Sequence, residues 1–232
     1  MHRSEPPFEV LYEDNHLLVV NKPAGLVVQA DQTGDQDLLA LGKAYLKVKY
    51  DKPGAVFLAL VHRLDRPASG VMVLARTSKA AARLTAQFKA RTPQKRYVAI
   101  VEGTPPLSGK ALDYLRKRYP NVEVVKPDVK GAKRAVLRWT TRSTVGRLAL
   151  VEVELETGRP HQIRVQLAHR GFPLLGDFRY GATQQLDGRN LALHCAAMTV
   201  EHPTRKERVT WAAPPPATWP AWARQNASDS AR

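Results

Sequence analysis

An aspartate surrounded by cationic residues is the most chemically suggestive feature of the sequence. In HRLDRPASGVMVLA, Asp65 lies between Arg63 and Arg66 and three residues after His62. Nearby positive charges favour the anionic form of a carboxyl group, so Asp65 could act as a nucleophile or base near neutral pH. In isolation, however, a surface cluster of charges without any catalytic role is the commoner explanation of such a pattern.

Two other segments carry side chains that could complete a site. In KRYVAIVEG, strand alternation places Tyr97 and Ala99 on one face, where a tyrosine could stack on a base and pass a proton, or simply belong to the core. In TGRPHQIRVQLAHRG, helical spacing places His161 and Arg164 on one face, with Leu167 one turn later. Arg164 could pair with a carboxylate or a phosphate, or belong to a solvated basic face.

The charge balance favours a polyanionic partner. The 232 residues include 36 Lys and Arg against 21 Asp and Glu, a formal net charge of +15. Nucleic acid rewards such an excess through counterion release. The apolar runs are too short to span a membrane and no signal peptide is evident, so we expect a cytoplasmic protein that binds no membrane.

We expect neither a metal nor a cofactor. Cys195 is the only cysteine, which excludes a Cys-based zinc cluster and an intrachain disulfide, and its apolar surroundings predict a buried, inert thiol. The seven histidines form no HExxH motif, and neither a GxxxxGK[ST] loop nor a GxGxxG after a strand is present.

The elements that must position these side chains are mostly strands. Apolar alternation and turn signals predict helices within 38–50, 78–91 and 157–171, the second with Ser78 as N-cap, and strands within 8–22, 56–61, 71–75, 95–103, 135–143, 148–156, 191–200 and 207–213. Residues 104–134 look irregular. We therefore expect one α+β domain over 8–213, with a central mixed or mainly antiparallel β-sheet flanked by helices and loops, and a flexible tail over 214–232.

Taken together, these segments resemble the RluA family of RNA pseudouridine synthases. The resemblance rests on YEDNHLLVVNKPAG, HRLDRPASGVMVLA, KRYVAIVEG, TGRPHQIRVQLAHRGFPLLGDFRYG and LHCAAMTVEHPT, which occur in the family's order. Pro67, Ala68 and Pro160 depart from the family's usual residues, and Pro160 would suit the first turn of a helix. Because only seven residues precede the match, we expect a member without the N-terminal S4 module.

The resemblance implies the pseudouridine synthase catalytic fold and a role for each matched residue. Asp65 would act on the sugar of a uridine so that the N1–C1′ bond breaks and the base rejoins through C5. Whether it attacks C1′ or removes the 2′ proton stays open. Tyr97 would lie against the base and accept the C5 proton, Arg164 would pair with Asp65, and Leu167 would line the pocket. The target nucleotide must leave its stack, which favours unpaired RNA over duplex.

The remaining candidates concern substrate binding. We expect ribosomal or transfer RNA as the partner of a monomeric enzyme. Four residues near the catalytic motifs are candidates for substrate binding: His62, Arg63, Arg159 and His161. Four residues of the basic segment could contact RNA as an arm: Lys126, Lys130, Lys133 and Arg134. Three alternatives remain: a non-catalytic RNA-binding factor, a glycosylase that leaves an abasic sugar, and a DNA-binding protein, for which no recognition helix or ribbon is evident.

Overall fold

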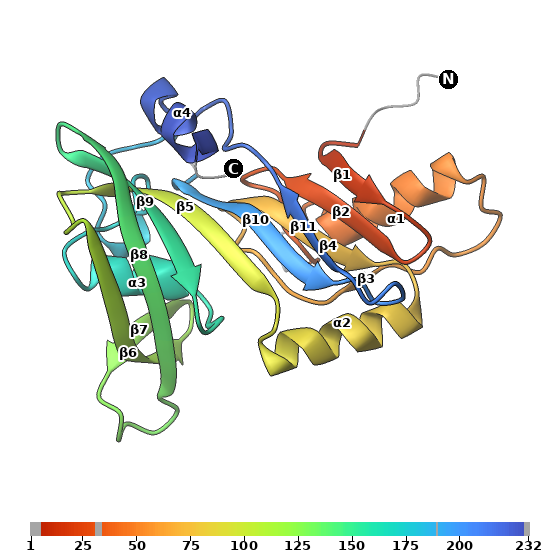
Figure 1. The fold of residues 1–232 in the computed structure, drawn as a ribbon, viewed down its shortest axis with the longest axis horizontal. Coiled ribbons are helices and arrows are strands. Elements are labelled where there is room, and N and C mark those ends of the chain that lie inside the picture. The colour runs from red at the N-terminus through yellow and green to blue at the C-terminus, as the bar shows by residue number, and fades with distance from the viewer. Residues whose placement is uncertain (1–5, 31–33, 189, 230–232) are drawn as a thin grey trace. The chain divides into compact units, whose positions relative to one another are not determined.

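The protein has an α+β fold, as the sequence predicted, in two compact units. The computed structural model describes residues 6–30, 34–188 and 190–229. Unit 1 comprises 1–94 and 197–213, and unit 2 comprises 95–196 and 214–232. Four α-helices and eleven strands occur in the described residues (Figure 1). The chain thus contributes two separate segments to each unit, where the sequence suggested one continuous domain.

Unit 1 is built on antiparallel strands, of which the inner ones are mainly apolar. β2 (Leu17–Lys22) pairs with both β1 (Glu9–Glu13) and β4 (Ser69–Ala75), and β3 (Ala59–Leu60) also pairs with β4. The end of β10 (Leu193–Glu201) pairs with β11 (Arg208–Ala212). Every residue of β4 is buried, so side chains on both faces of this strand contribute to the core.

The two helices of unit 1 begin at side-chain caps. Asp37 caps α1 (Leu38–Lys49) by accepting a hydrogen bond from the Ala40 amide at 2.9 Å. Thr77 caps α2 (Ser78–Ala90), so the prediction of Ser78 as the cap was wrong by one residue. The predicted strand over 56–61 was also too long, because only β3 forms there and Phe57 is half exposed.

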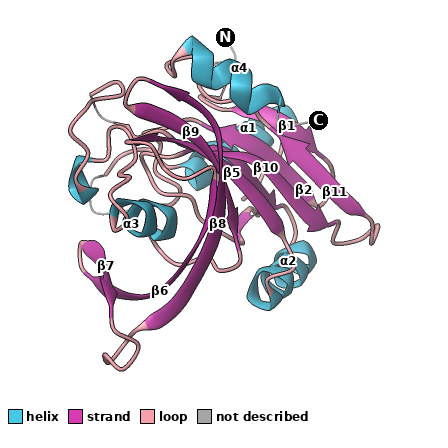
Figure 2. Ribbon diagram, turned by 60° about the vertical axis from the view of Figure 1, so that its left-hand side comes forward, coloured by secondary structure: helices cyan, strands magenta, loops and turns pink. Residues whose placement is uncertain are grey.

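Unit 2 contains a curved antiparallel sheet. Its strand order is β5 (Gln94–Glu102), β9 (Leu148–Leu155), β8 (Lys133–Val145), β6 (Ser108–Arg118) and β7 (Asn121–Val125). Figure 2 shows β8 and β6 bending around α3 (Gln162–Ala168). The expectation of irregular structure over 104–134 was wrong, because most of this segment forms the β6–β7 hairpin and the start of β8.

The tail is ordered over its described part. Residues 221–229 form α4 (Ala221–Asp229), which the expectation of a flexible tail did not anticipate. Trp219, Ala223 and Ala227 are buried against Val98 of β5 and Leu150 of β9, so this part of the chain completes the core of unit 2. Residues 230–232 lie outside the described residues. None of the described helices has the length and apolarity needed to cross a membrane.

Candidate active site

Asp65 occupies a tight turn that leads into β4 in unit 1. Its carbonyl oxygen accepts a hydrogen bond from the Ala68 amide at 3.0 Å, which closes the turn around Pro67. Ala68 is fully buried, whereas Asp65 is partly exposed. The small side chain at position 68 therefore lets the turn dock on the core while the carboxylate stays reachable from solvent.

A buried lysine fixes the backbone of this turn through hydrogen bonds. Lys22, at the end of β2, is fully buried, and its ammonium donates to the carbonyl oxygens of Pro23 and Leu26, both at 2.8 Å, and of Arg66 at 3.2 Å. The Gly25 amide donates to the same Arg66 carbonyl at 2.8 Å. Burial lowers the pKa of Lys22 to about 7, although the charge of Asp65 favours the protonated form. Lys22 therefore fixes the backbone of the Asp65 turn, a role that the sequence analysis missed.

The cationic residues of the HRLDR motif have different surroundings. The Arg66 guanidinium pairs with Asp35 at 2.6 Å and donates to the Gly25 carbonyl at 3.1 Å. Nε2 of His62 accepts a hydrogen bond from the Val73 amide at 3.0 Å, and its ring stacks on Phe88. These contacts fix His62 to β4 and α2. Arg63 is exposed, and the contact of His62 and Arg63 with substrate stays a prediction.

In unit 2, α3 holds Arg164 in a buried ion pair. Nε and Nη2 of Arg164 each donate to one oxygen of Asp177, both at 2.7 Å, and both side chains are almost fully buried. Such a bidentate pair fixes the plane of the guanidinium as well as its charge. Leu167 is also fully buried in α3. The expected pairing of Arg164 with Asp65 stays a prediction.

Tyr180 joins three elements around Arg164. The Arg164 guanidinium lies over the Tyr180 ring, 5.1 Å from its centroid. The Tyr180 hydroxyl lies 2.7 Å from Nδ1 of His161 and accepts a hydrogen bond from the Val122 amide of β7 at 3.0 Å. Burial raises the pKa of Tyr180. The hydroxyl is thus a neutral group that links β7, α3 and the 3₁₀ turn Phe178–Tyr180.

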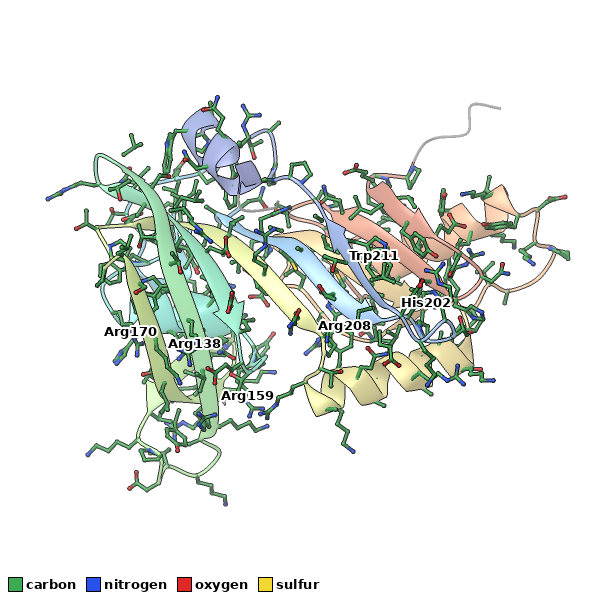
Figure 3. The ribbon with its side chains drawn as sticks, viewed as in Figure 1. Arg138, Arg159, Arg170, His202, Arg208 and Trp211 are labelled. Atoms are coloured by element: carbon green, nitrogen blue, oxygen red, sulfur yellow. The ribbon has the colours of Figure 1, made fainter. Side chains whose placement is uncertain are left out.

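Polar side chains fasten both ends of α3 to the sheet. Before the helix, Thr157 and Gln162 bond to each other and to the backbone of Val136, and Nε of Arg159 donates to the Arg134 carbonyl at 3.1 Å. After the helix, Arg170, which is labelled in Figure 3, pairs with Asp113 of β6 at 2.8 Å. α3 begins at Gln162, so the prediction that Pro160 lies in its first turn was wrong.

Tyr97 lies on β5 opposite the face that α4 covers. It is 6% exposed and pairs across the ladder with Val153. Its hydroxyl hydrogen-bonds to Cys195, whose pKa burial raises to about 12, as expected for an inert thiol. Burial also lowers the pKa of Lys95. Its side chain lies next to Gly158, since a β-carbon added to that glycine would lie 3.3 Å from Nζ of Lys95. Lys95 was not among the sequence candidates.

The structure groups most of the predicted residues within their own unit. His62, Arg63 and Asp65 share one segment of unit 1, whereas Arg164 and Leu167 lie on α3 of unit 2 and His161 directly precedes that helix. The four candidate RNA-contact residues, Lys126, Lys130, Lys133 and Arg134, are all exposed on β8 and the loop before it. Asp177 and Tyr180 were missed as positioning residues, although both stand in the matched stretch FPLLGDFRYG.

Comparison with known proteins decides the family. The model of the RNA pseudouridylate synthase family matches residues 16–169. The chain belongs to this family. It is therefore an isomerase that converts uridine in RNA to pseudouridine, and the RluA-type resemblance is confirmed.

Individual relatives agree with this assignment of the synthase. It is 37% identical over 222 residues to the ribosomal large subunit pseudouridine synthase D of Zymomonas mobilis, covering 90% of this chain and 70% of that one. It is 38% identical over 215 residues to the uncharacterized RNA pseudouridine synthase YhcT of Bacillus subtilis, covering 90% and 69%. The structure of human RNA pseudouridylate synthase domain containing 4 matches with a TM-score of 0.76 and 26% identity, over 95% of this chain and 92% of that one.

Proposed function

We propose that this synthase modifies ribosomal RNA and that Asp65 is its catalytic residue. The observation that carries the second part is the construction of the Asp65 turn, in which a fully buried lysine fixes the backbone below a partly exposed carboxylate. A merely structural surface aspartate needs no such support. Ribosomal RNA is favoured over transfer RNA because several relatives are named for the large ribosomal subunit.

The reaction needs a group that acts on the sugar, one that handles the base and one that holds the geometry. Asp65 attacks C1′ or removes the 2′ proton, and by either route the N1–C1′ bond breaks and a C5–C1′ bond forms. Tyr97 accepts the proton that C5 loses, and N1 gains a proton, so the RNA keeps its mass. Arg164, oriented by Asp177, is proposed to pair with Asp65, and Leu167 to line the pocket. His62, Arg63, Arg159 and His161 are proposed to bind the substrate, which flips out of its stack.

The experiment is a pseudouridine map of RNA from cells with and without the gene, read from carbodiimide-adduct stops. We expect one or a few stops in ribosomal RNA to disappear without the gene. Purified wild-type protein should restore them on protein-free RNA, whereas Asp65→Asn should be slower by at least about 1,000-fold, because it keeps the shape but loses the reactive carboxylate.

The RNA affinity of Asp65→Asn is the control for this assay. It should stay within about threefold of wild type, and a parallel loss of binding would mean that Asp65 is structural. Missing stops in transfer RNA alone would move the substrate from ribosomal to transfer RNA. A cleaved base with an abasic sugar would indicate a glycosylase.

We further propose that the exposed residues Lys126, Lys130, Lys133 and Arg134 contact RNA phosphates. Replacing all four by Gln should weaken RNA binding and lower the slope of log K against log salt by up to about 3, since each phosphate contact contributes about 0.7 to 0.9. Replacing four exposed cations of unit 1, Lys43, Lys47, Lys52 and Lys79, is a charge-matched control. An unchanged slope in the first variant would exclude this arm.

We also propose that the enzyme is monomeric and cytoplasmic and needs no obligatory protein partner. Light scattering at assay concentration tests whether it is a monomer.

A further inference from the structure

The tip of the β6–β7 hairpin presents an aromatic ring to solvent. Tyr119 follows the last residue of β6 and is 83% exposed. A tyrosine ring offers a large apolar area whose burial would be favourable, yet at this position it covers no part of the unit's own core. An aromatic side chain held in this way is available to a partner.

The hairpin below the ring is held firmly. Arg116 donates two hydrogen bonds across the hairpin to Glu123, at 2.9 and 2.7 Å. The Val122 amide donates to the Tyr180 hydroxyl at 3.0 Å, and the Val122 side chain is buried with Leu115 of β6 and Val165 of α3. The backbone that carries Tyr119 is therefore attached to the interior of unit 2, and a partner would not have to order it.

The surroundings of the ring are strongly basic. The Lys117 ammonium lies 5.8 Å from the Tyr119 ring centroid, and Arg118, the next residue, is exposed. From Ser108 to Val145 the chain has ten Lys and Arg against three Asp and Glu, an excess of seven in a protein whose net charge is +15. An exposed ring with cations beside it matches the way proteins bind single-stranded nucleic acid, by stacking on bases and neutralising phosphates.

We propose that Tyr119 stacks on an unpaired base of the RNA, while Lys117 and Arg118 contact the flanking phosphates. This site lies outside the catalytic residues and deepens the proposed function, since it rests on RNA being the substrate. It selects for single-stranded RNA, because a base inside a duplex already stacks on its neighbours. Lys126, Lys130, Lys133 and Arg134 supply charge only, whereas Tyr119 reads an exposed base face.

The test is the affinity of the full chain for two RNA probes, a fluorescein-labelled 20-nucleotide oligouridylate and a 20-base-pair duplex, at several salt concentrations. Tyr119→Ala should bind the oligouridylate roughly 5- to 160-fold more weakly, the range of one lost stacking contact. Its affinity for the duplex should be unchanged. Its salt slope should also be unchanged because the ring carries no charge, whereas Lys117→Gln should lower the slope by about 0.7.

Two control variants separate stacking from other effects. Tyr119→Phe keeps the ring and should bind within about twofold of wild type. Leu112→Ala removes another exposed apolar side chain of β6, seven residues away or about 23 Å along the strand, and should have no effect. Thermal unfolding of each variant should match wild type, because the tip side chain is exposed.

Several outcomes would overturn the proposal. One is equal RNA affinity of Tyr119→Ala and wild type. Another is a loss of RNA affinity in Tyr119→Phe as large as that in Tyr119→Ala. A third is that Tyr119→Ala loses binding to oligoglutamate but not to RNA, which would indicate an acidic protein partner. A pseudouridine assay on the same protein preparations separates this from the proposed function. Tyr119-dependent binding without pseudouridine in ribosomal RNA would leave the stacking site standing and reject the proposed substrate. Pseudouridine formation without Tyr119-dependent binding would reject only the stacking site.

Discussion

The turn that carries Asp65 and the helix that carries Arg164 are both fixed by buried charge, but the charge is compensated differently. In unit 1, the Lys22 ammonium donates to three neutral carbonyl oxygens. In unit 2, the Arg164 guanidinium meets the full negative charge of Asp177. A buried cation on neutral acceptors makes stability depend on pH, whereas a buried ion pair makes it depend on both partners being present.

Among the variants that test this comparison, the largest effect is expected for Asp177→Asn. The variant keeps the shape of the side chain but removes its charge from a pair that is almost fully buried. Losing one partner of a buried pair costs roughly 3 kcal/mol of the free energy of unfolding, and the misplaced guanidinium should lower kcat by about 100-fold. Urea unfolding and single-turnover rates measure the two effects.

Asp113→Asn is the matched control at the other end of α3. Its partner Arg170 is 24% exposed, so the loss should be near 1 kcal/mol, with little change in kcat. Equal losses of stability and of rate in the two variants would show that Asp177 merely holds the helix in place and does not orient Arg164.

This comparison also explains what could be predicted from sequence. The stretches HRLDRPASG, KRYVAIVEG and TGRPHQIR mark Asp65, Tyr97 and Arg164 as catalytic candidates because their residue types and order are recognisable. The partners are different. Lys22 reads as an ordinary lysine at the end of an apolar strand, and only the tertiary structure shows that the chain closes over it. Asp177 lies 13 residues from Arg164 in a loop-like stretch, so their pairing depends on how that loop folds back.

Two of the elements that were missed, β6 and α4, lack the patterns that reveal such elements. β6 exposes side chains on both faces, and only Ala111 and Leu115 are buried in its eleven residues, so hydrophobic alternation is weak. The turn at Tyr119-Pro120 contains neither Gly nor Asp. The fully buried residues of α4 are small alanines, with only Trp222 packed partly buried beside them, and the helix follows three prolines, which made its segment look like a flexible tail.

Lys22→Met tests the unit 1 side of the comparison through pH. The pKa of Lys22 in the folded protein, about 7, lies below its ordinary value of 10.5. Between these values the unfolded chain binds more protons, so stability rises with pH. From pH 7 to pH 9, wild type should gain about 2 kcal/mol relative to Lys22→Met, measured by urea unfolding at both pH values. If the difference in unfolding free energy between wild type and Lys22→Met were the same at both pH values, burial would not lower the pKa of Lys22. Lys49→Met, at an exposed lysine, is the control and should show the same difference from wild type at both pH values.

Apart from the Asp113→Asn control, the smallest effect is expected for Tyr180→Phe, which removes one hydroxyl and keeps the ring below Arg164. The hydroxyl accepts the Val122 amide hydrogen bond and contacts His161, so its loss should cost about 1 kcal/mol and lower kcat only a few-fold. Hydrogen exchange of the Val122 amide should become faster, while that of amides in β9 should not. Tyr180→Leu also removes the ring and should lower kcat further, because the guanidinium then loses the face it lies on. If Tyr180→Phe and Tyr180→Leu lower kcat equally, the ring does not orient Arg164. In that case Asp177 alone fixes the guanidinium, and the difference from the turn held by Lys22 rests on that ion pair.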